Sequence, residues 1–301
     1  MDMRGKESEG GLCGTIRYLR RMSRSPSSGA LVLAACLASG SPLAAQWVEP
    51  PGQGWVALTT YHQDTRDVYD LQGRKDTFVG AGHVIATASF LTVARGLTRG
   101  VDAWAQFSFL RLRFSDLTGE STATGVGDTR FYVRLNPLLL VGMDLPVAVR
   151  AGVKLPVGDF DVGSDQLPLG DGQRDWEIML EGGWSFYPAP FYFMSWAGYR
   201  WREARDGGRT DFGNERFFYA ALGGTALLDF KFAVEGWYGQ TPVFNNVLAV
   251  GAERELLRLG PSLLLNVGPG QLEVGARIPL RGRSLPAGEE LVLGYFTRFG
   301  G

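Results

Sequence analysis

The stretch Asp128–Asn136, DTRFYVRLN, alternates polar and apolar side chains over its whole length. Its even-numbered positions are charged or polar, whereas the positions between them are Thr129, Phe131, Val133 and Leu135. Side chains of a β-strand point alternately to opposite faces, so this alternation predicts a strand with one polar and one apolar face. A helix would instead space its apolar residues three or four positions apart.

The same alternation recurs in Leu145–Pro156, Asp175–Tyr187 and Gln271–Leu280. In each segment one face carries charged residues repeatedly and the other carries almost none. Strands of this kind fit two folds. A soluble β-sandwich turns the apolar face toward its core, whereas a transmembrane β-barrel turns the apolar face toward lipid and the charged face toward the lumen.

The chain from residue 46 onward divides into strand-length segments. They are Gly54–Gln63, His83–Gly96, Val101–Ser115, Gly125–Leu138, Leu145–Pro156, Asp175–Tyr187, Phe191–Glu203, Glu215–Leu228, Lys231–Gln240, Arg254–Gly268, Gln271–Leu280 and Glu289–Phe299. Short connections alternate with longer polar ones such as Asp64–Asp76, Asp116–Thr124 and Val157–Gln173, which is typical of outer-membrane barrels. The pattern predicts an all-β fold, an antiparallel transmembrane β-barrel of about 12 strands over residues 46–301. Counts of about ten or fourteen stay open, because some segments have ambiguous ends.

The third segment, Val101–Ser115, departs from simple alternation. Asp102, Gln106 and Ser108 lie on one face of the expected strand. Arg111 and Arg113 lie on the opposite face. Either a bulge near Phe109 exchanges the two faces, or the two arginines lie beyond the bilayer in an extended outer rim.

The last segment predicts an amphipathic strand. Leu291, Leu293, Tyr295, Thr297 and Phe299 share one face of it. Outer-membrane barrels end in a similar strand with an aromatic residue at or near the C-terminus, which the barrel assembly machinery reads. Tyr295 and Phe299 are therefore the predicted assembly signal. The expected partners are that machinery and the lipid of the outer membrane.

Residues 1–45 are predicted to be a signal peptide. Arg24 precedes an apolar run from residue 30 to residue 38, and small residues surround a cleavage point after Ala45. The apolar run is too short to span a membrane as a helix. Met22 is a second candidate start, which would make the residues before it a spurious extension. Together with the strand pattern, the signal peptide predicts the outer membrane of a diderm bacterium.

The composition narrows the chemistry further. The chain has 42 Gly and 12% aromatic residues, which fits closely paired strands flanked by aromatic girdles. Cys13 and Cys36 both lie in the first 45 residues, so the rest of the chain can hold neither a disulfide framework nor a Cys-based metal site. Cys36 ends an LAAC tetrapeptide that resembles a lipoprotein signal and competes with cleavage after Ala45. Beyond residue 45 the chain has 24 basic and 28 acidic residues, a net charge of −4, and no basic patch or arm suggests nucleic acid as a partner.

Three short motifs resemble a known family. Gly125–Asn136, GVGDTRFYVRLN, and Gly152–Phe160, GVKLPVGDF, are similar to elements of the outer-membrane barrels named for the meta-pathway of phenol degradation. The stretch Gly96–Asp102, GLTRGVD, is similar to a periplasmic turn of that family, whereas Val157 replaces its usual Thr. The resemblance spans most of residues 54–299. It implies a small outer-membrane barrel that is suspected of passing organic compounds.

The charged residues on the inward face are the predicted functional set. On one interpretation they line a pore and select solutes by charge and hydration. On the other they form an ion-pair network that fills a narrow lumen, because buried charges need partners. Barrels of about eight strands are filled and those of about sixteen hold aqueous channels, so both interpretations stay open. The set is Asp128, Arg130, Arg134, Arg150, Lys154, Asp175, Glu177, Glu181, Lys231, Glu235, Glu273 and Arg277.

The predicted function is a passive narrow channel for small organic solutes, aromatic or hydrophobic ones among them. One alternative is a structural or adhesive barrel with a plugged lumen and partner-binding outer loops. Another is a lipid-modifying enzyme that would use His62. We expect no catalytic residue, no cofactor and no metal, because His62 and His83 stand apart from any nucleophile motif. The acidic outer loops, Asp64–Asp76 among them, have no fixed calcium-ligand spacing.

Overall fold

The computed structural model describes residues 48–160, 167–225 and 228–300. The predicted signal peptide, with Met22 and both cysteines, lies outside these residues. Within the described ranges, no helix is both long enough and apolar enough to cross a membrane.

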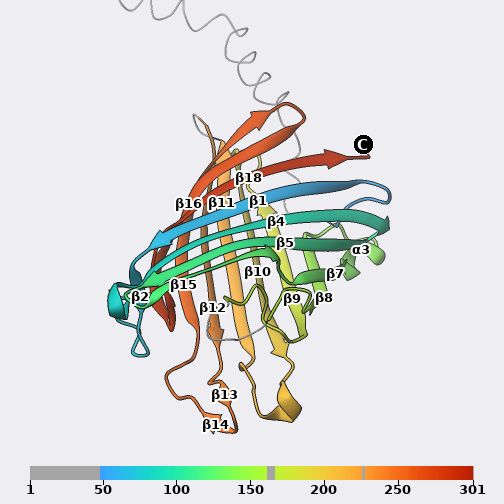
Figure 1. The fold of residues 1–301 in the computed structure, drawn as a ribbon. Coiled ribbons are helices and arrows are strands. Elements are labelled where there is room, and N and C mark those ends of the chain that lie inside the picture. Colours follow the sequence, from blue (N-terminus) through green and yellow to red (C-terminus); the bar gives the residue numbers. More distant parts are fainter. Residues whose placement is uncertain (1–47, 161–166, 226–227, 301) are drawn as a thin grey trace, which may run out of the picture. The chain divides into compact units, whose positions relative to one another are not determined.

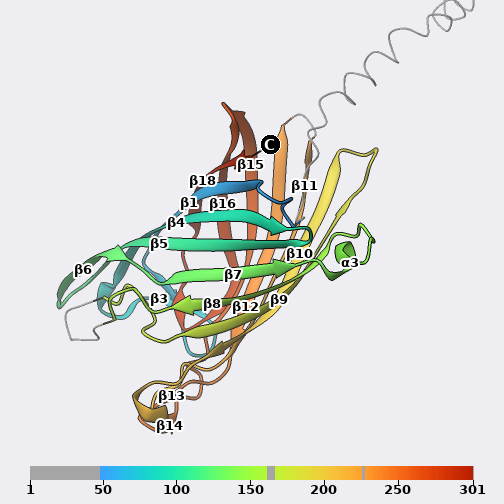
Figure 2. The ribbon, with the colours of Figure 1, turned by 90° about the vertical axis from the view of Figure 1, so that its right-hand side faces the viewer.

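A closed antiparallel sheet forms the wall of the structure (Figures 1 and 2). Each long strand pairs with its neighbours in chain order, and β1 also pairs with β18, which closes the barrel. β6 and β7 pair with successive parts of β5 and so share one position in the wall, which confirms the predicted twelve-stranded barrel. The wall strands are β1 (Gly54–Thr65), β4 (His83–Thr98), β5 (Val101–Asp116), β6 (Gly119–Val126), β7 (Thr129–Leu135), β8 (Val147–Leu155), β9 (Asp175–Ser185), β10 (Phe191–Arg202), β11 (Glu215–Thr225), β12 (Asp229–Gly239), β15 (Glu255–Val267), β16 (Gly270–Arg283) and β18 (Glu290–Phe299).

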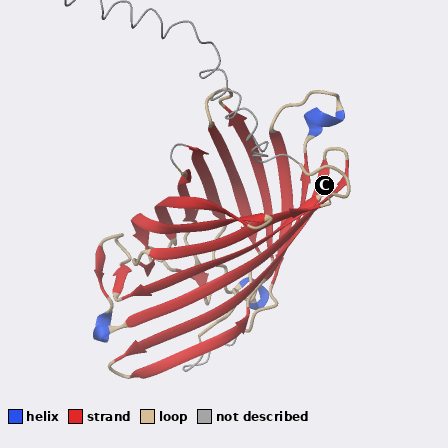
Figure 3. Cartoon of the chain, turned by 90° about the horizontal axis from the view of Figure 1, so that it is seen from above, coloured by secondary structure: helices blue, strands red, loops and turns tan. Residues whose placement is uncertain are grey.

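Most of the smaller elements lie in the long connections at one end of the barrel (Figure 1). This is the end at which the sequence predicts the outer loops. There β17 pairs with β2, and β2 pairs with β3, while β13 pairs with β14 in a separate hairpin. The helical turn α3 lies instead in the connection from β7 to β8, at the opposite end of the barrel. Figure 3 shows the strands of the wall from above. The bounds are β2 (Asp67–Tyr69), β3 (Lys75–Thr77), η1 (Val79–Ala81), α3 (Pro137–Leu140), η2 (Asp206–Gly208), β13 (Val243–Phe244), β14 (Val247–Leu248) and β17 (Leu285–Pro286).

Strand β9 shows how the two faces of the wall differ. Trp176, Leu180 and Trp184 face outward and are 50%, 60% and 57% exposed. Glu177 and Glu181, on the opposite face, are 4% and 2% exposed. A soluble β-sandwich would bury the apolar face and expose the charged one. The reverse arrangement, with tryptophans near both ends of an apolar band, is that of a transmembrane barrel.

One predicted connection is wrong. The stretch Asp116–Thr124 was expected to be a long outer loop, but Gly119–Val126 forms β6 and pairs with β5. The Asp116 carboxylate closes a tight turn, because its Oδ1 accepts hydrogen bonds from the backbone N–H of Thr118 at 2.7 Å and from that of Gly119 at 3.2 Å. The polar composition of this run suggested a loop, whereas its Ser and Thr residues extend a hairpin beyond the wall (Figure 2).

The same hairpin explains the two exceptional arginines of β5. The β4–β5 register is unbroken around Phe109, so the bulge expected as one explanation is wrong. Arg111 therefore keeps the outward parity of Phe107 and Phe109 and is exposed. Arg113 contacts Glu120 of β6 at 2.7 Å, within the hairpin. The structure thus agrees with the alternative of an extended rim.

The last strand has the predicted alternation. Phe296 faces the lumen, so Tyr295 and Phe299 lie on the outward face of β18. The Tyr295 hydroxyl donates a hydrogen bond to the backbone oxygen of Val267 at 3.1 Å, which ties the end of β18 to the turn after β15. Recognition of these aromatic residues by the assembly machinery stays a prediction.

Candidate functional site

The lumen contains a cavity of about 840 Å³. Side chains from every position of the wall line it, and β1 contributes Trp55, Ala57, Thr59, Tyr61 and Gln63. These are consecutive inward-facing positions, and Trp55 and Gln63 lie about 26 Å apart along the strand at the usual rise per residue. The cavity therefore follows β1 nearly from end to end.

The predicted charged set divides into two groups. Seven of its members line the cavity, and five are buried beside the cavity without lining it. The first group is Arg130, Arg150, Glu177, Lys231, Glu235, Glu273 and Arg277. The second is Asp128, Arg134, Lys154, Asp175 and Glu181. The first group fits the pore-lining interpretation, and the second fits the ion-pair interpretation, but neither role is tested by its position alone.

The buried charges of β5, β7 and β9 form a tight network. Asp102 lies directly opposite Arg134 in the β5–β7 register, and Arg134 Nη2 donates to Asp102 Oδ2 at 2.6 Å. Arg134 Nη1 also lies 3.4 Å from Glu181 Oε2. Asp102 accepts further hydrogen bonds from the Trp104 indole at 3.0 Å and from the Glu49 backbone N–H at 2.9 Å. Asp102 was missing from the predicted set, although it shares the face of other inward-facing polar residues of β5.

A second buried network fastens an outer loop to the wall. The Lys154 ammonium, whose side chain is 0% exposed, lies 2.8 Å from Asp175, 3.2 Å from Asp128 and 2.5 Å from Asp171. Asp171 belongs to the loop between β8 and β9, and its backbone N–H donates to Asp128 Oδ2 at 3.0 Å. Burial acts to raise the pKa of Asp171, but the Lys154 ammonium and the Arg202 guanidinium outweigh it and hold that pKa well below its usual value. Asp161 and Asp165 of the same loop lie outside the described residues.

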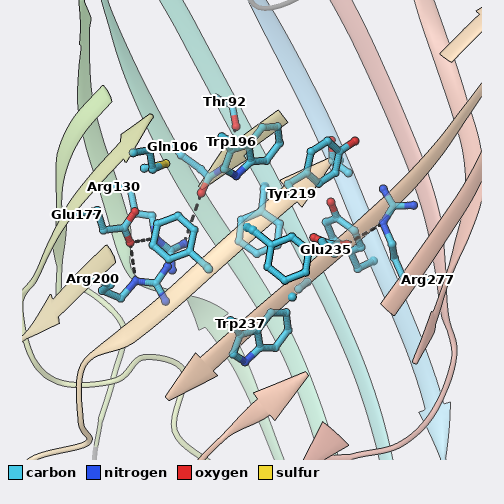
Figure 4. A pocket seen from close by; sticks show the side chains of 18 of the residues that line it. Thr92, Gln106, Arg130, Glu177, Trp196, Arg200, Tyr219, Glu235, Trp237 and Arg277 are labelled. Atoms are coloured by element: carbon cyan, nitrogen blue, oxygen red, sulfur yellow. Dashed lines mark hydrogen bonds and ion pairs between the residues drawn. The ribbon is translucent and has the colours of Figure 1, made fainter. Parts of the chain in front are cut away.

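A row of charged groups runs along the inner face of the wall from β7 to β11, and Figure 4 labels Arg130, Glu177 and Arg200 in it. Glu177 accepts a hydrogen bond from Arg200 Nε at 2.7 Å and another from the Tyr132 hydroxyl at 2.8 Å, and Arg130 Nε lies 3.8 Å away. Arg200 also pairs with Glu215. The prediction missed Arg200 and Glu215. The inward alternation of β10, which places Arg200 on the face of the cavity-lining Trp196, was the signal that could have found the arginine.

The strands β12, β15 and β16, on the other side of the lumen, carry their own ion pairs. Lys231 Nζ donates to Glu273 Oε2 at 2.7 Å, and Arg277 Nε lies 3.1 Å from Glu235 Oε1. Arg258, which the prediction missed, donates to Glu235 at 2.8 Å and also contacts Glu290. The two charged walls are separated by aromatic side chains (Figure 4).

The aromatic surface is built around one stacked pair. The rings of Trp196 and Tyr219 lie 3.9 Å apart between centroids with an interplanar angle of 10°. Both line the cavity, as do Trp104 and Trp237. Rings of this kind offer apolar, polarisable faces to a planar ligand. The site therefore combines flat apolar surface with fixed charges.

The histidines lie away from this site. His62 stands between the cavity-lining Tyr61 and Gln63 and so faces outward, where its Nδ1 lies 2.9 Å from Thr87 Oγ1. His83 begins β4 at the outer end, and its Nε2 lies 2.5 Å from Asp64 Oδ1. The described part of the chain contains no group of three or more His, Cys, Asp or Glu residues placed to hold a metal ion.

A family comparison matches most of the barrel. The family described as "Putative MetA-pathway of phenol degradation" matches residues 54–294. The comparison with curated protein sequences gives no match.

Solved structures of outer-membrane proteins share the fold. An outer membrane channel from Pseudomonas putida F1 is 14% identical with a TM-score of 0.67, over 84% of this chain and 98% of that chain. The β domain of the Bordetella autotransporter BrkA is 14% identical with a TM-score of 0.50, over 82% of this chain and 100% of that chain. At these identities the likeness establishes the architecture, that of an outer-membrane β-barrel.

Proposed function

The chain belongs to the family described as the putative MetA-pathway of phenol degradation, and from this premise we propose that it is a passive outer-membrane channel for small organic solutes. Aromatic and other hydrophobic compounds are among the solutes. The observation that carries the proposal is the cavity that follows β1 from Trp55 to Gln63. A passage of this length between the two ends of the strands supports movement of a solute down its concentration gradient.

The distribution of buried charge favours an open lumen over a plugged one. Arg134 and Lys154, the cations of the two buried networks, are packed against the wall and do not line the cavity, and among the acidic partners of Lys154 only Asp171 reaches the lining. Their ion pairs therefore stabilise the wall without crossing the passage. The proposal assigns no catalysis to the chain, because His62 faces outward, apart from the charged groups of the lumen.

Recordings from the refolded protein in planar bilayers test the proposal. We expect discrete conductance steps, which the Ala57→Trp substitution should lower by at least about twofold because the indole would narrow the lumen. Leu58→Trp is the matched control, since Leu58 is 50% exposed on the outward face of the same strand. That variant should keep the conductance of the unchanged protein.

Silent bilayers would overturn the channel proposal if the protein in them is folded. In that case the plugged structural barrel with partner-binding loops would be the better account. Equal conductance for both Trp variants and the unchanged protein would also contradict it, because the current would then not pass through the cavity beside β1.

A further inference from the structure

Arg150 of β8 is held in the cavity lining by aromatic rings. The residue is 7% exposed, and its Cζ lies 4.4 Å from the ring centroid of Trp104, 5.0 Å from that of Tyr132 and 5.9 Å from that of Trp196. All four residues line the cavity. Aromatic faces attract a guanidinium through their quadrupole and leave its edge free to bind a planar anion. The rings thus orient this cation toward the lumen.

The hydrogen-bonding capacity of Arg150 is largely unused. Its Nε lies 2.6 Å from Glu181 Oε1, and this ion pair does not have the geometry of a hydrogen bond. Neither of its terminal amino groups donates to a partner in the described part of the chain, whereas Arg134 donates to both oxygens of Asp102. An oxyanion in the cavity would accept charge-assisted hydrogen bonds from these terminal amino groups.

The charge of the lining also favours an anion. Eight basic and six acidic residues are found among the described side chains that line the cavity. Glu181, the acidic neighbour of Arg150, is shared with Arg134 at 3.4 Å. Arg150 therefore shares its acidic partner with a second guanidinium.

The surface beside Arg150 suits a ring attached to that anion. Trp196, which contacts the guanidinium, is stacked on Tyr219, and both rings line the cavity (Figure 4). The cavity volume of about 840 Å³ lies within the range of small-molecule sites, which is roughly 300–1,000 Å³. A planar ring can contact this surface while its carboxylate reaches the guanidinium.

We propose that Arg150 and its surrounding rings form a binding site for aromatic carboxylates inside the lumen. The role of this site in permeation rests on the channel function proposed above, whereas binding itself does not. The carboxylate oxygens accept hydrogen bonds from the terminal amino groups of Arg150. The ring of the ligand packs against the stack of Trp196 and Tyr219.

Tryptophan fluorescence of the folded protein in detergent, titrated with benzoate, tests the binding site. We expect benzoate to bind at least about tenfold more tightly than either benzyl alcohol or acetate, because only benzoate has both the ring and the carboxylate. Arg150→Gln should weaken benzoate binding by about tenfold or more. Lys231→Gln, the matched control, removes another cation of the lining and should weaken it less than about threefold.

A second variant keeps the test valid if Arg150→Gln does not fold. Arg150→Lys retains the charge beside Glu181 but loses the planar fork, so it should weaken benzoate binding without abolishing it. The proposal is overturned if benzyl alcohol binds as well as benzoate, or if the Arg150 and Lys231 variants weaken benzoate binding equally. Selective binding together with silent bilayers would contradict the channel and leave this site standing. Conductance without a preference for benzoate would contradict only the site.

Discussion

Lys154→Met is expected to lower the free energy of unfolding by about 3–5 kcal/mol, because it leaves buried carboxylates without their cation. The Lys154 ammonium lies within 3.2 Å of Asp128, Asp171 and Asp175, and the Asp175 side chain is 1% exposed. Methionine is of similar length, so the substitution removes the charge and leaves little empty space. Denaturant unfolding of the refolded barrel, followed by tryptophan fluorescence, measures the loss.

The control for this prediction is the same substitution in an exposed ion pair. Lys75 lies 3.0 Å from Asp67, and the two side chains are 54% and 39% exposed. Lys75→Met should therefore cost less than about 1 kcal/mol, as surface pairs usually do. Similar costs for the two variants would show that the Lys154 network does not stabilise the wall.

A charge on the outward face of the wall is expected to have the second large effect on stability. Leu180→Arg should destabilise the barrel in lipid vesicles by about 2–4 kcal/mol, since a charge at the bilayer midplane is costly on the lipid face of a barrel. Leu180 lies midway between the outward-facing Trp176 and Trp184 of β9. Equilibrium unfolding from vesicles of defined lipid gives the cost.

Leu117→Arg provides the comparison for the lipid face. Leu117 is 83% exposed in the turn between β5 and β6, beyond the apolar band. Its substitution should change stability by less than about 0.5 kcal/mol, as is usual for surface positions. If Leu180→Arg were no more costly than Leu117→Arg, the exposed apolar face would not be in contact with lipid.

The strands and their faces could be predicted because alternation is a local property of the sequence. Odd and even positions alone assigned Glu177 and Glu181 to one face of the strand and Trp176 and Leu180 to the other. The structure confirms these two faces. The β6 strand escaped prediction for a related reason. Its residues from Glu120 to Thr124 are mostly polar on both faces, so they lack the alternation of polar and apolar side chains that marks the other strands.

The pairing of charges could not be predicted in this way. Asp102 meets Arg134 because the β5–β7 register places them opposite each other, and that register depends on contacts between strands far apart in the sequence. Asp171 reaches Lys154 because the loop between β8 and β9 folds back onto the wall. Loop conformation of this kind leaves no periodic signal. The aromatic cover of Arg150 was missed for the same reason, since its rings come from β5, β7 and β10.

The side chains of β1 should face the lumen and the lipid in turn, and the accessibility of introduced cysteines tests this arrangement most directly. A protein produced from residue 46 onward contains no cysteine, so single cysteines can be introduced along its β1 strand without background reaction. In lipid vesicles, a water-soluble thiol reagent should modify Ala57→Cys and Thr59→Cys, whose positions line the cavity, and leave Val56→Cys and Leu58→Cys unmodified. Protection of positions 57 and 59, or equal reaction at all four positions, would contradict an open lumen enclosed by a lipid-facing wall.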